Sequence, residues 1–214
     1  RVYALIESDS YKDDRGLYVS NNAGKSWSKV TSEPRLVQRA WYYIELFIDP
    51  KNEDTIYVLS APALRSNDGG KTWEKLSGAH GDFHDLWINP DNPQNFVISD
   101  DGGASITFDK GKSFSTLSNL PTGQFYRINV DNQFPYRIYG GQQDNSSVSI
   151  ASRELGASGI TTSAWTASAG GESAFLAFDP DNPRFILGGS YQGTIEAIDL
   201  KATAGTNIMP APIQ

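Results

Sequence analysis

The two histidines of the chain lie close together in the segment HGDFHDLW, residues 80–87. If this segment is extended, His80, Asp82 and His84 project to the same face, because side chains in a strand alternate with a period of two. Two imidazoles and a carboxylate in that arrangement could bind a divalent metal ion or transfer a proton near neutral pH. A hydrogen-bonded polar network is the competing and preferred interpretation, so no metal or cofactor is expected.

Three glycine-flanked polar clusters could complete a site. They are SDDGG, GGQQDNSS and GGESAF, at residues 99–103, 140–147 and 170–175. Glycine lets a ligand approach the backbone closely, and a pair of carboxylates can hydrolyse a glycosidic bond. The candidate catalytic residues are Asp82, Asp101, Asp144 and Glu172, and the candidate ligand-binding residues are His80, His84, Gln143 and Tyr126. The alternative is that these side chains only satisfy backbone amides in turns.

Aromatic side chains could line a sugar-binding cleft near these polar groups. Most of them are expected to fill the interfaces between sheets, because large rings dominate β cores. Tyr42, Tyr43, Phe125 and Tyr126 are the better cleft candidates, since they lie in or near expected links between sheets.

A turn sequence that recurs three times predicts the elements that position these residues. It reads SNNAGKSW, SNDGGKTW and TFDKGKSF, and it starts at Ser20, Ser66 and Thr107. The spacings of 46 and 41 residues are typical of a four-stranded propeller blade. The repeat therefore predicts the fold before any single residue is considered for chemistry.

Each residue of the repeated turn has a local structural role. The Asp or Asn accepts hydrogen bonds from nearby amides, glycine allows a positive φ, and the hydroxyl residues bond back to the turn. The rings of Trp27, Trp73 and Phe114 are expected to be buried between sheets. The turn residues are therefore predicted to be structural rather than catalytic, and they include Ser66, Asp68, Gly70, Thr72, Trp73, Asp109 and Gly111.

A second repeat runs in phase with the first. A short apolar strand, a polar turn with Asp or Asn, and a second β-rich strand recur around Asp49, Asn89, Asp131 and Asp179. Together the repeats predict an all-β chain, a β-propeller of four-stranded antiparallel blades. We expect about five blade-like units over residues 1–200, as part of a larger multi-blade protein, and a linker or tail over residues 201–214. The segment after Ser149 is expected to form a longer hairpin in place of the repeated turn.

Composition excludes several classes of function. The chain has 214 residues, with 25 acidic and 18 basic side chains and a net charge of −7. It carries no Lys/Arg cluster, which argues against nucleic-acid binding. No apolar run approaches the roughly 20 residues that a membrane span needs, so membrane insertion is not expected. The absence of cysteine excludes a disulfide framework in this segment.

The repeated turn resembles the Asp-box, also called the bacterial neuraminidase repeat. That repeat occurs in sialidases, glycoside hydrolase family 74 xyloglucanases, sortilin-type receptor domains and photosystem assembly propellers. Three longer segments, at residues 80–103, 123–147 and 170–193, together look like large bacterial proteins grouped with sortilin-type and family 74-like propellers, and this resemblance covers most of residues 41–200. Because such relatives are typically exported, the resemblance implies an extracellular, periplasmic or cell-surface location.

Three functions are compatible with these observations. The preferred hypothesis is a non-catalytic propeller that binds a protein, peptide or glycan. The second is an inverting, family 74-like glycoside hydrolase that acts on a β-glucan through two carboxylates. The third is a structural subunit of a cell-envelope assembly. A sialidase is disfavoured, because the arginines do not recur at matching positions of successive repeats.

Overall fold

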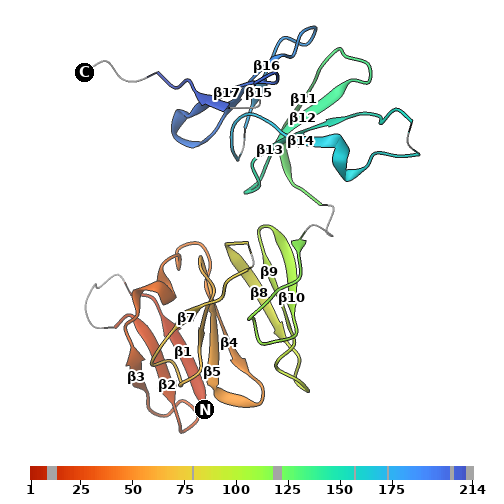
Figure 1. Ribbon diagram of the computed structural model, residues 1–214. Helices are drawn as coiled ribbons and strands as arrows, with labels where there is room; N and C mark the ends of the chain where they lie inside the picture. The colour runs from red at the N-terminus through yellow and green to blue at the C-terminus, as the bar shows by residue number, and fades with distance from the viewer. Residues whose placement is uncertain are drawn as a thin grey trace. The chain divides into compact units, whose positions relative to one another are not determined.

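The computed structural model describes residues 1–8, 14–78, 80–117, 122–156, 158–172, 174–202 and 205–210. The chain divides into two compact units, Arg1–Pro121 and Thr122–Gln214, which we describe separately (Figure 1). The helical elements of the described part are short 3-10 turns: η1 (Pro34–Val37), η3 (Thr162–Ala164) and η4 (Tyr191–Gly193). No helix in this part is long and apolar enough to cross a membrane.

Unit 1 contains three antiparallel sheets. Their strand orders are β1-β2-β3, β4-β5-β6-β7 and β10-β9-β8, so strands that are consecutive in sequence are neighbours in space. The strands are β1 (Val2–Ile6), β2 (Gly16–Ser20), β3 (Ser28–Thr31), β4 (Glu45–Asp49), β5 (Asn52–Leu59), β6 (Leu64–Ser66), β7 (Glu74–Lys75), β8 (Phe83–Ile88), β9 (Phe96–Asp100) and β10 (Gly103–Thr107). Each sheet is thus a meander of the kind that forms a propeller blade.

Unit 2 contains two further meanders, each with four strands. Their orders are β11-β12-β13-β14 and β15-β16-β17-β18. The strands are β11 (Phe125–Val130), β12 (Arg137–Gln142), β13 (Ser147–Ala151), β14 (Trp165–Ala167), β15 (Leu176–Ala177), β16 (Phe185–Gly189), β17 (Ile195–Asp199) and β18 (Gly205–Asn207). The described residues therefore form five sheets, the number that the repeats predict.

Strand β5 shows why the sheets stack within unit 1. Its residues Ile56 and Val58 are fully buried in a core shared with the first sheet, together with Leu17. The alternate residues Tyr57 and Leu59 are equally buried in a core shared with the third sheet. Because successive side chains point to opposite faces, β5 contributes to both cores and must be apolar on both sides.

The prediction of an all-β chain built from antiparallel blades is confirmed, with one difference in strand number. The first and third sheets have three strands among the described residues. In the first sheet, Val2 pairs with Ser20 as Ile56 pairs with Ser66 in the second sheet, so β1 matches a second strand rather than an innermost one. In the third sheet, a single backbone bond from Ser115 to Ile106, 2.8 Å long, lies where a fourth strand would begin.

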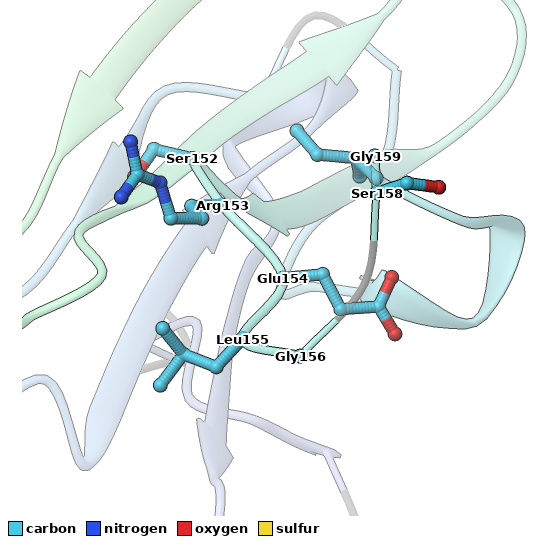
Figure 2. Close-up of a pocket in the computed structure, with 8 residues that line it drawn as sticks. Ser152, Arg153, Glu154, Leu155, Gly156, Ser158 and Gly159 are labelled. Atoms are coloured by element: carbon cyan, nitrogen blue, oxygen red, sulfur yellow. The ribbon is translucent and has the colours of Figure 1, made fainter.

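The fourth sheet has the longer hairpin that the sequence predicts. Strands β13 and β14 pair antiparallel, and their connection encloses an open hollow of about 490 Å³ (Figure 2). Glu154 lines this hollow and accepts hydrogen bonds from the amide and the hydroxyl of Thr161, at 2.9 Å and 2.8 Å. The two bonds close the loop between Glu154 and Thr161, and they lower the pKa of Glu154. None of the predicted site residues lines the hollow.

The segment 201–214 differs from the predicted linker. Its residues Gly205–Asn207 form β18, which pairs with β17 and completes the fifth sheet. Residues 201–207 are mostly small and show no alternation of apolar and polar side chains, so the sequence does not predict a strand there. The strand forms because it pairs with β17. Residues 203–204 and 211–214 of this segment lie outside the described residues.

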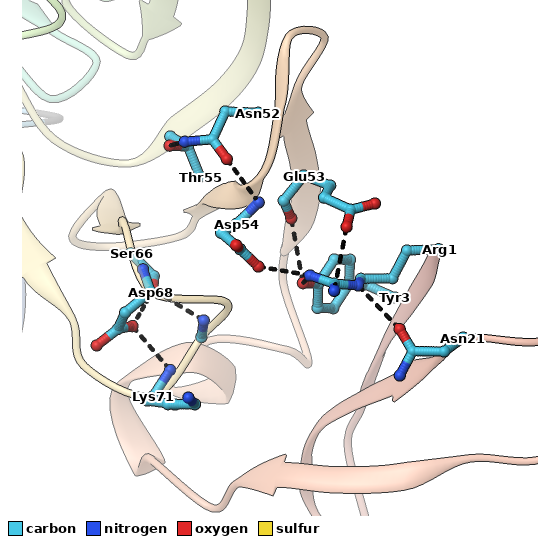
Figure 3. A network of polar contacts seen from close by, with 11 residues as sticks. Arg1, Tyr3, Asn21, Asn52, Glu53, Asp54, Thr55, Ser66, Asp68 and Lys71 are labelled. Atoms are coloured by element: carbon cyan, nitrogen blue, oxygen red, sulfur yellow. Dashed lines mark hydrogen bonds and ion pairs between the residues drawn. The ribbon is translucent and has the colours of Figure 1, made fainter.

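The repeated turn between β6 and β7 closes as its composition predicts (Figure 3). Asp68 Oδ1 accepts hydrogen bonds from the amides of Lys71 and Thr72, at 3.0 Å and 2.9 Å, and Oδ2 accepts one from the Thr72 hydroxyl at 2.6 Å. The Gly70 amide donates to Ser66 Oγ, 2.8 Å away. The hydrogen bonds that Asp68 accepts, above all that from the Thr72 hydroxyl, lower the pKa of Asp68 to about 2. The carboxylate is thus a fixed part of the turn.

The first and third copies repeat this network. Asp109 accepts bonds from Ser113 N, 2.9 Å, and Ser113 Oγ, 2.6 Å, which lower its pKa to about 2. The Gly111 amide donates to Thr107 Oγ at 2.9 Å. In the first copy Asn22 Oδ1 accepts from the Ser26 amide at 2.9 Å. The structural assignment of the turn residues is therefore consistent with their contacts in all three copies.

The aromatic residue after each turn is partly buried in two copies of three. Trp73 and Phe114 are partly buried and pack against the cores of unit 1. The expectation for Trp27 is wrong, because this ring is 43% exposed. Trp27 follows the turn of the first sheet, and no further sheet of the described part of unit 1 covers that side.

A polar network ties the first sheet to the start of β5 (Figure 3). The Arg1 guanidinium forms ion pairs with Glu53, at 3.1 Å, and with Asp54. It also donates to Asn21 Oδ1 at 2.9 Å, in the repeated turn of the first sheet. These contacts are exposed, so they fix the relative position of the two sheets more than they stabilise the unit.

Candidate functional site

In unit 1, an irregularity in β8 redirects the side chain of His84. The register between β8 and β9 shifts between Phe83 and Asp85, so His84 is the extra residue of a β-bulge. Bulges re-aim side chains and often lie beside functional sites. His84 Nε2 lies 2.6 Å from Oδ1 of Asp101, the residue directly after β9. The structure therefore brings together two of the predicted site residues.

Asp82 faces a basic partner from a distant link. It precedes β8 in a left-handed turn conformation, with φ 53°, and its carboxylate forms an ion pair with Arg39. The carboxylate raises the pKa of the Arg39 guanidinium. Arg39 also stacks over the rings of Tyr42 and Trp41, with its guanidinium carbon 4.6 Å and 5.5 Å from the ring centroids.

The aromatic run after η1 forms an exposed border beside these charges. Trp41 is 75% exposed and Tyr42 is 50% exposed. The Tyr43 ring lies 5.1 Å from the His84 ring, and its hydroxyl donates to the His84 carbonyl oxygen. Burial raises the pKa of Tyr43 to about 12, so it acts as a neutral donor. We call Arg39, Trp41, Tyr42, Asp82, His84 and Asp101 the Arg39 cluster.

The expectation that His80, Asp82 and His84 share one face is wrong. The strand begins only at Phe83, and Asp82 lies in a turn. The His80 amide donates to the buried carboxylate of Asp100 at 3.1 Å, and the His80 ring packs against Gly102. Among the residues that the structure describes, no three His, Cys, Asp or Glu side chains are placed to hold a metal ion.

Unit 2 contains a bulge at the equivalent position. The register between β11 and β12 shifts between Phe125 and Arg127, which makes Tyr126 the extra residue. The Tyr126 hydroxyl donates to Oε1 of Gln143, the residue that follows β12 as Asp101 follows β9. The same backbone device thus presents an imidazole–carboxylate pair in one sheet and a phenol–amide pair in another.

Gln143 connects this bulge to two carboxylates. Its Nε2 donates to Asp144 Oδ2 at 3.1 Å and to Glu172 Oε1 at 3.0 Å. Glu172 Oε1 also accepts bonds from Tyr126, at 3.5 Å, and from Tyr191. The bond to Glu172 raises the pKa of Tyr191 to about 12. We call Tyr126, Gln143, Asp144, Glu172 and Tyr191 the Glu172 cluster.

Apart from His80, the predicted catalytic and ligand-binding residues therefore gather in two clusters, one in each unit. Sequence reasoning missed Arg39, Trp41 and Tyr191 as members. Each lies near a signal that was visible. Arg39 stands two residues before the aromatic run that Trp41 begins, and Tyr191 stands two residues after the glycine pair that ends β16. His80 and Asp100 belong to neither cluster, because their contacts shape the turn around Gly102.

Comparisons with known proteins identify the repeated turn. Residues 64–75 match the family model described as BNR/Asp-box repeat. That match confirms the resemblance drawn from the three turns, and it covers the second of them.

A curated relative matches part of the chain. It is a probable oligoxyloglucan-reducing end-specific xyloglucanase of Neosartorya fischeri, 26% identical over 106 residues. The match covers 44% of this chain and 13% of the relative.

Solved structures with the same class of fold have low sequence identity. The GH74 enzyme of Niastella koreensis is 18% identical, with a TM-score of 0.36, over 91% of this chain and 34% of that one. YCF48 of Cyanidioschyzon merolae is 15% identical, with a TM-score of 0.33, over 89% of this chain and 64% of that one. The chain thus spans about a third of the first of these proteins and less than two thirds of the second.

Proposed function

We propose that this chain is part of a non-catalytic recognition protein that binds a protein, peptide or glycan outside the cytoplasm, and that the Arg39 cluster is its contact surface. The observation that carries the proposal is the pairing of exposed flat rings, Trp41 and Tyr42, with fixed charged groups beside them. Amphipathic rings next to convergent hydrogen-bonding groups are the usual composition of ligand sites.

A glycan is the ligand class to test first. Exposed aromatic faces can stack on the apolar faces of sugar rings, while His84, Asp101 and Asp82 offer hydrogen-bonding groups to hydroxyls. Both carboxylates are already engaged by basic side chains, an arrangement suited to orienting a ligand. Because a partial relative is named a xyloglucanase, xyloglucan and other β-glucans come first in the ligand panel.

The test is affinity electrophoresis and calorimetry of the 214-residue chain against this panel, with reducing-sugar release measured in the same samples. Trp41→Ala and Tyr42→Ala should each weaken binding about ten-fold or more, as truncation of a central aromatic contact does. Phe134→Ala, which removes an 87% exposed ring in unit 2, is the matched control. If all three variants bind with the same affinity, the Arg39 cluster is not the contact surface.

A glycoside hydrolase is the second candidate, and one observation favours it. Asp144 and Glu172 accept hydrogen bonds from the same nitrogen of Gln143, so two carboxylates converge in unit 2. If these two carboxylates are a catalytic pair, Asp144→Asn and Glu172→Gln should each reduce sugar release to background. If the wild-type chain neither binds a glycan of the panel nor releases sugar from it, the remaining candidate is favoured, a structural subunit of a cell-envelope assembly.

A further inference from the structure

The Glu172 carboxylate is surrounded by neutral donors. Its Oε1 accepts hydrogen bonds from Gln143, Tyr126 and Tyr191, and every bond that the described residues donate to Glu172 ends on this oxygen. In the same part of the chain, no Lys, Arg or His nitrogen lies within 4.0 Å of the carboxylate. Among the described residues, the negative charge is therefore held in place without a basic partner, and none of the hydrogen bonds that they donate to Glu172 ends on Oε2.

The rings around Glu172 add to its attraction for a cation. Tyr126 is 46% exposed and Tyr191 is 58% exposed, so both rings border the carboxylate at the surface. The face of an aromatic ring carries the negative part of its quadrupole and attracts cations. An aromatic face in the same unit already does so, because the Arg127 guanidinium lies over the Phe175 ring, 5.5 Å from its centroid.

The composition of the cluster points to an organic cation rather than a metal ion. Asp144 and Glu172 are its two acidic side chains, and the described residues contain no group of three metal-ligating side chains. Calcium takes six to eight oxygen ligands, more than these two carboxylates supply. An alkylammonium group needs one or two acceptors and can lay its methylene stem against the tyrosine rings.

We propose that the Glu172 cluster binds a primary ammonium group, with Glu172 Oε2 accepting an N–H bond and the Tyr126 and Tyr191 rings contacting the alkyl stem. The group could come from a lysine side chain of a protein ligand or from a free amine. This site lies in unit 2 and uses none of the residues of the Arg39 cluster, so its test is independent of the test of that cluster. It shares Asp144 and Glu172 with the second candidate function, from which it differs in predicting binding without sugar release.

The test is an NMR titration of the complete chain that follows the Gln143 side-chain amide, which donates to both carboxylates. The probes are the peptide Ac-Gly-Gly-Lys-Gly-Gly-NH2, the same peptide with norleucine in place of lysine, and n-butylamine. We expect saturable shifts with the lysine peptide and none with the norleucine peptide. If the lysine peptide binds more tightly than n-butylamine, the ammonium group is assigned to a protein ligand. If the two bind equally, the site is assigned to amines in general.

Two variants and one salt titration complete the design. Glu172→Gln should weaken binding at least ten-fold, whereas Glu154→Gln, which removes another carboxylate of unit 2, should leave it unchanged. Raising NaCl to 0.5 M should weaken wild-type binding several-fold, because partly exposed charges are screened; this arm does not depend on a variant that folds. Equal shifts from the norleucine peptide, unchanged affinity in Glu172→Gln, or affinity independent of salt would each overturn the proposal.

Discussion

Lys110 Nζ lies 3.1 Å from the carboxylate of Asp49, which is almost completely buried. Lys110 belongs to the repeated turn of the third sheet, and Asp49 begins the turn between β4 and β5 of the second. Asp49 also accepts bonds from the amides of Lys51 and Asn52, at 2.9 Å and 3.2 Å. The two sequence repeats thus meet in space, since the turn of one sheet neutralises the buried acid of the preceding one.

Removal of this lysine should leave a buried charge without its partner. Lys110→Met is expected to lower the free energy of unfolding by about 2 to 4 kcal/mol, near the range for breaking one side of a buried ion pair. The measurement is urea denaturation at neutral pH. Lys112→Met, in the same turn but exposed, should change stability by less than about 0.5 kcal/mol. Equal effects of the two variants would contradict the assigned role of Lys110.

Two tyrosines at matching strand positions should respond differently to loss of the hydroxyl. Tyr139 donates to the buried Asp131 Oδ2 at 2.8 Å, whereas the buried Tyr57 hydroxyl has no hydrogen-bond partner among the described residues. Tyr139→Phe should cost about 1 to 3 kcal/mol because an acceptor is left unsatisfied. Tyr57→Phe should be neutral or stabilising. Thermal and urea unfolding of both variants test this, and a larger loss at Tyr57 would refute it.

The repeated turns should make stability depend on acid pH. Hydrogen bonds lower the pKa values of Asp68 and Asp109 to about 2 in the folded state, below the unfolded value of about 3.9. Their contribution is therefore complete above about pH 4 and is lost as the pH falls towards 2. Urea midpoints measured from pH 2 to 7 should show this loss, and a double variant with Asn at both positions should show less of it.

The first turn supplies the converse experiment. It has Asn22 where the other copies have Asp. Asn22 Oδ1 accepts the equivalent bond from the Ser26 amide, but Asn22 Nδ2 donates to the Ser26 hydroxyl, which in the Asp copies is the donor. Asn22→Asp should add stability above pH 4 and increase the loss below it. An unchanged pH profile in this variant would show that the turn bonds do not distinguish the carboxylate from the amide.

Gly70 is required by both conformation and space. Its φ is 93°, and a Cβ at this position would lie 2.3 Å from Leu17 Cδ2. Gly70→Ala should therefore lower stability by about 2 to 4 kcal/mol, from backbone strain and crowding together. Gly24 has the same role in the first turn, with φ 85°, but its nearest neighbour would be 3.9 Å away. Gly24→Ala should cost only the strain, about 1 to 2 kcal/mol, and a chemical denaturation series separates the two values.

Local chemistry explains which features could be predicted from sequence. Asp68 and Gly70 make bonds within eight residues, so composition alone indicates their roles. The direction of His84 depends on a register shift between two strands, which residue types do not reveal. Arg39 meets Asp82 across 43 residues, and Tyr191 meets Glu172 across 19. These members were missed because the folding of separate links, rather than a motif, brings them together.

The bulges at His84 and Tyr126 separate the chemistry of the surface from the architecture beneath it. Each inserts one residue that no cross-strand partner constrains, while the flanking residues keep their pairing. The inserted side chain can change from imidazole to phenol, and its partner from carboxylate to amide, without a change in the sheet. Each bulged sheet therefore offers one inserted position and one partner position. Substitution of these two residues changes the surface chemistry and leaves the strand pairing as it is.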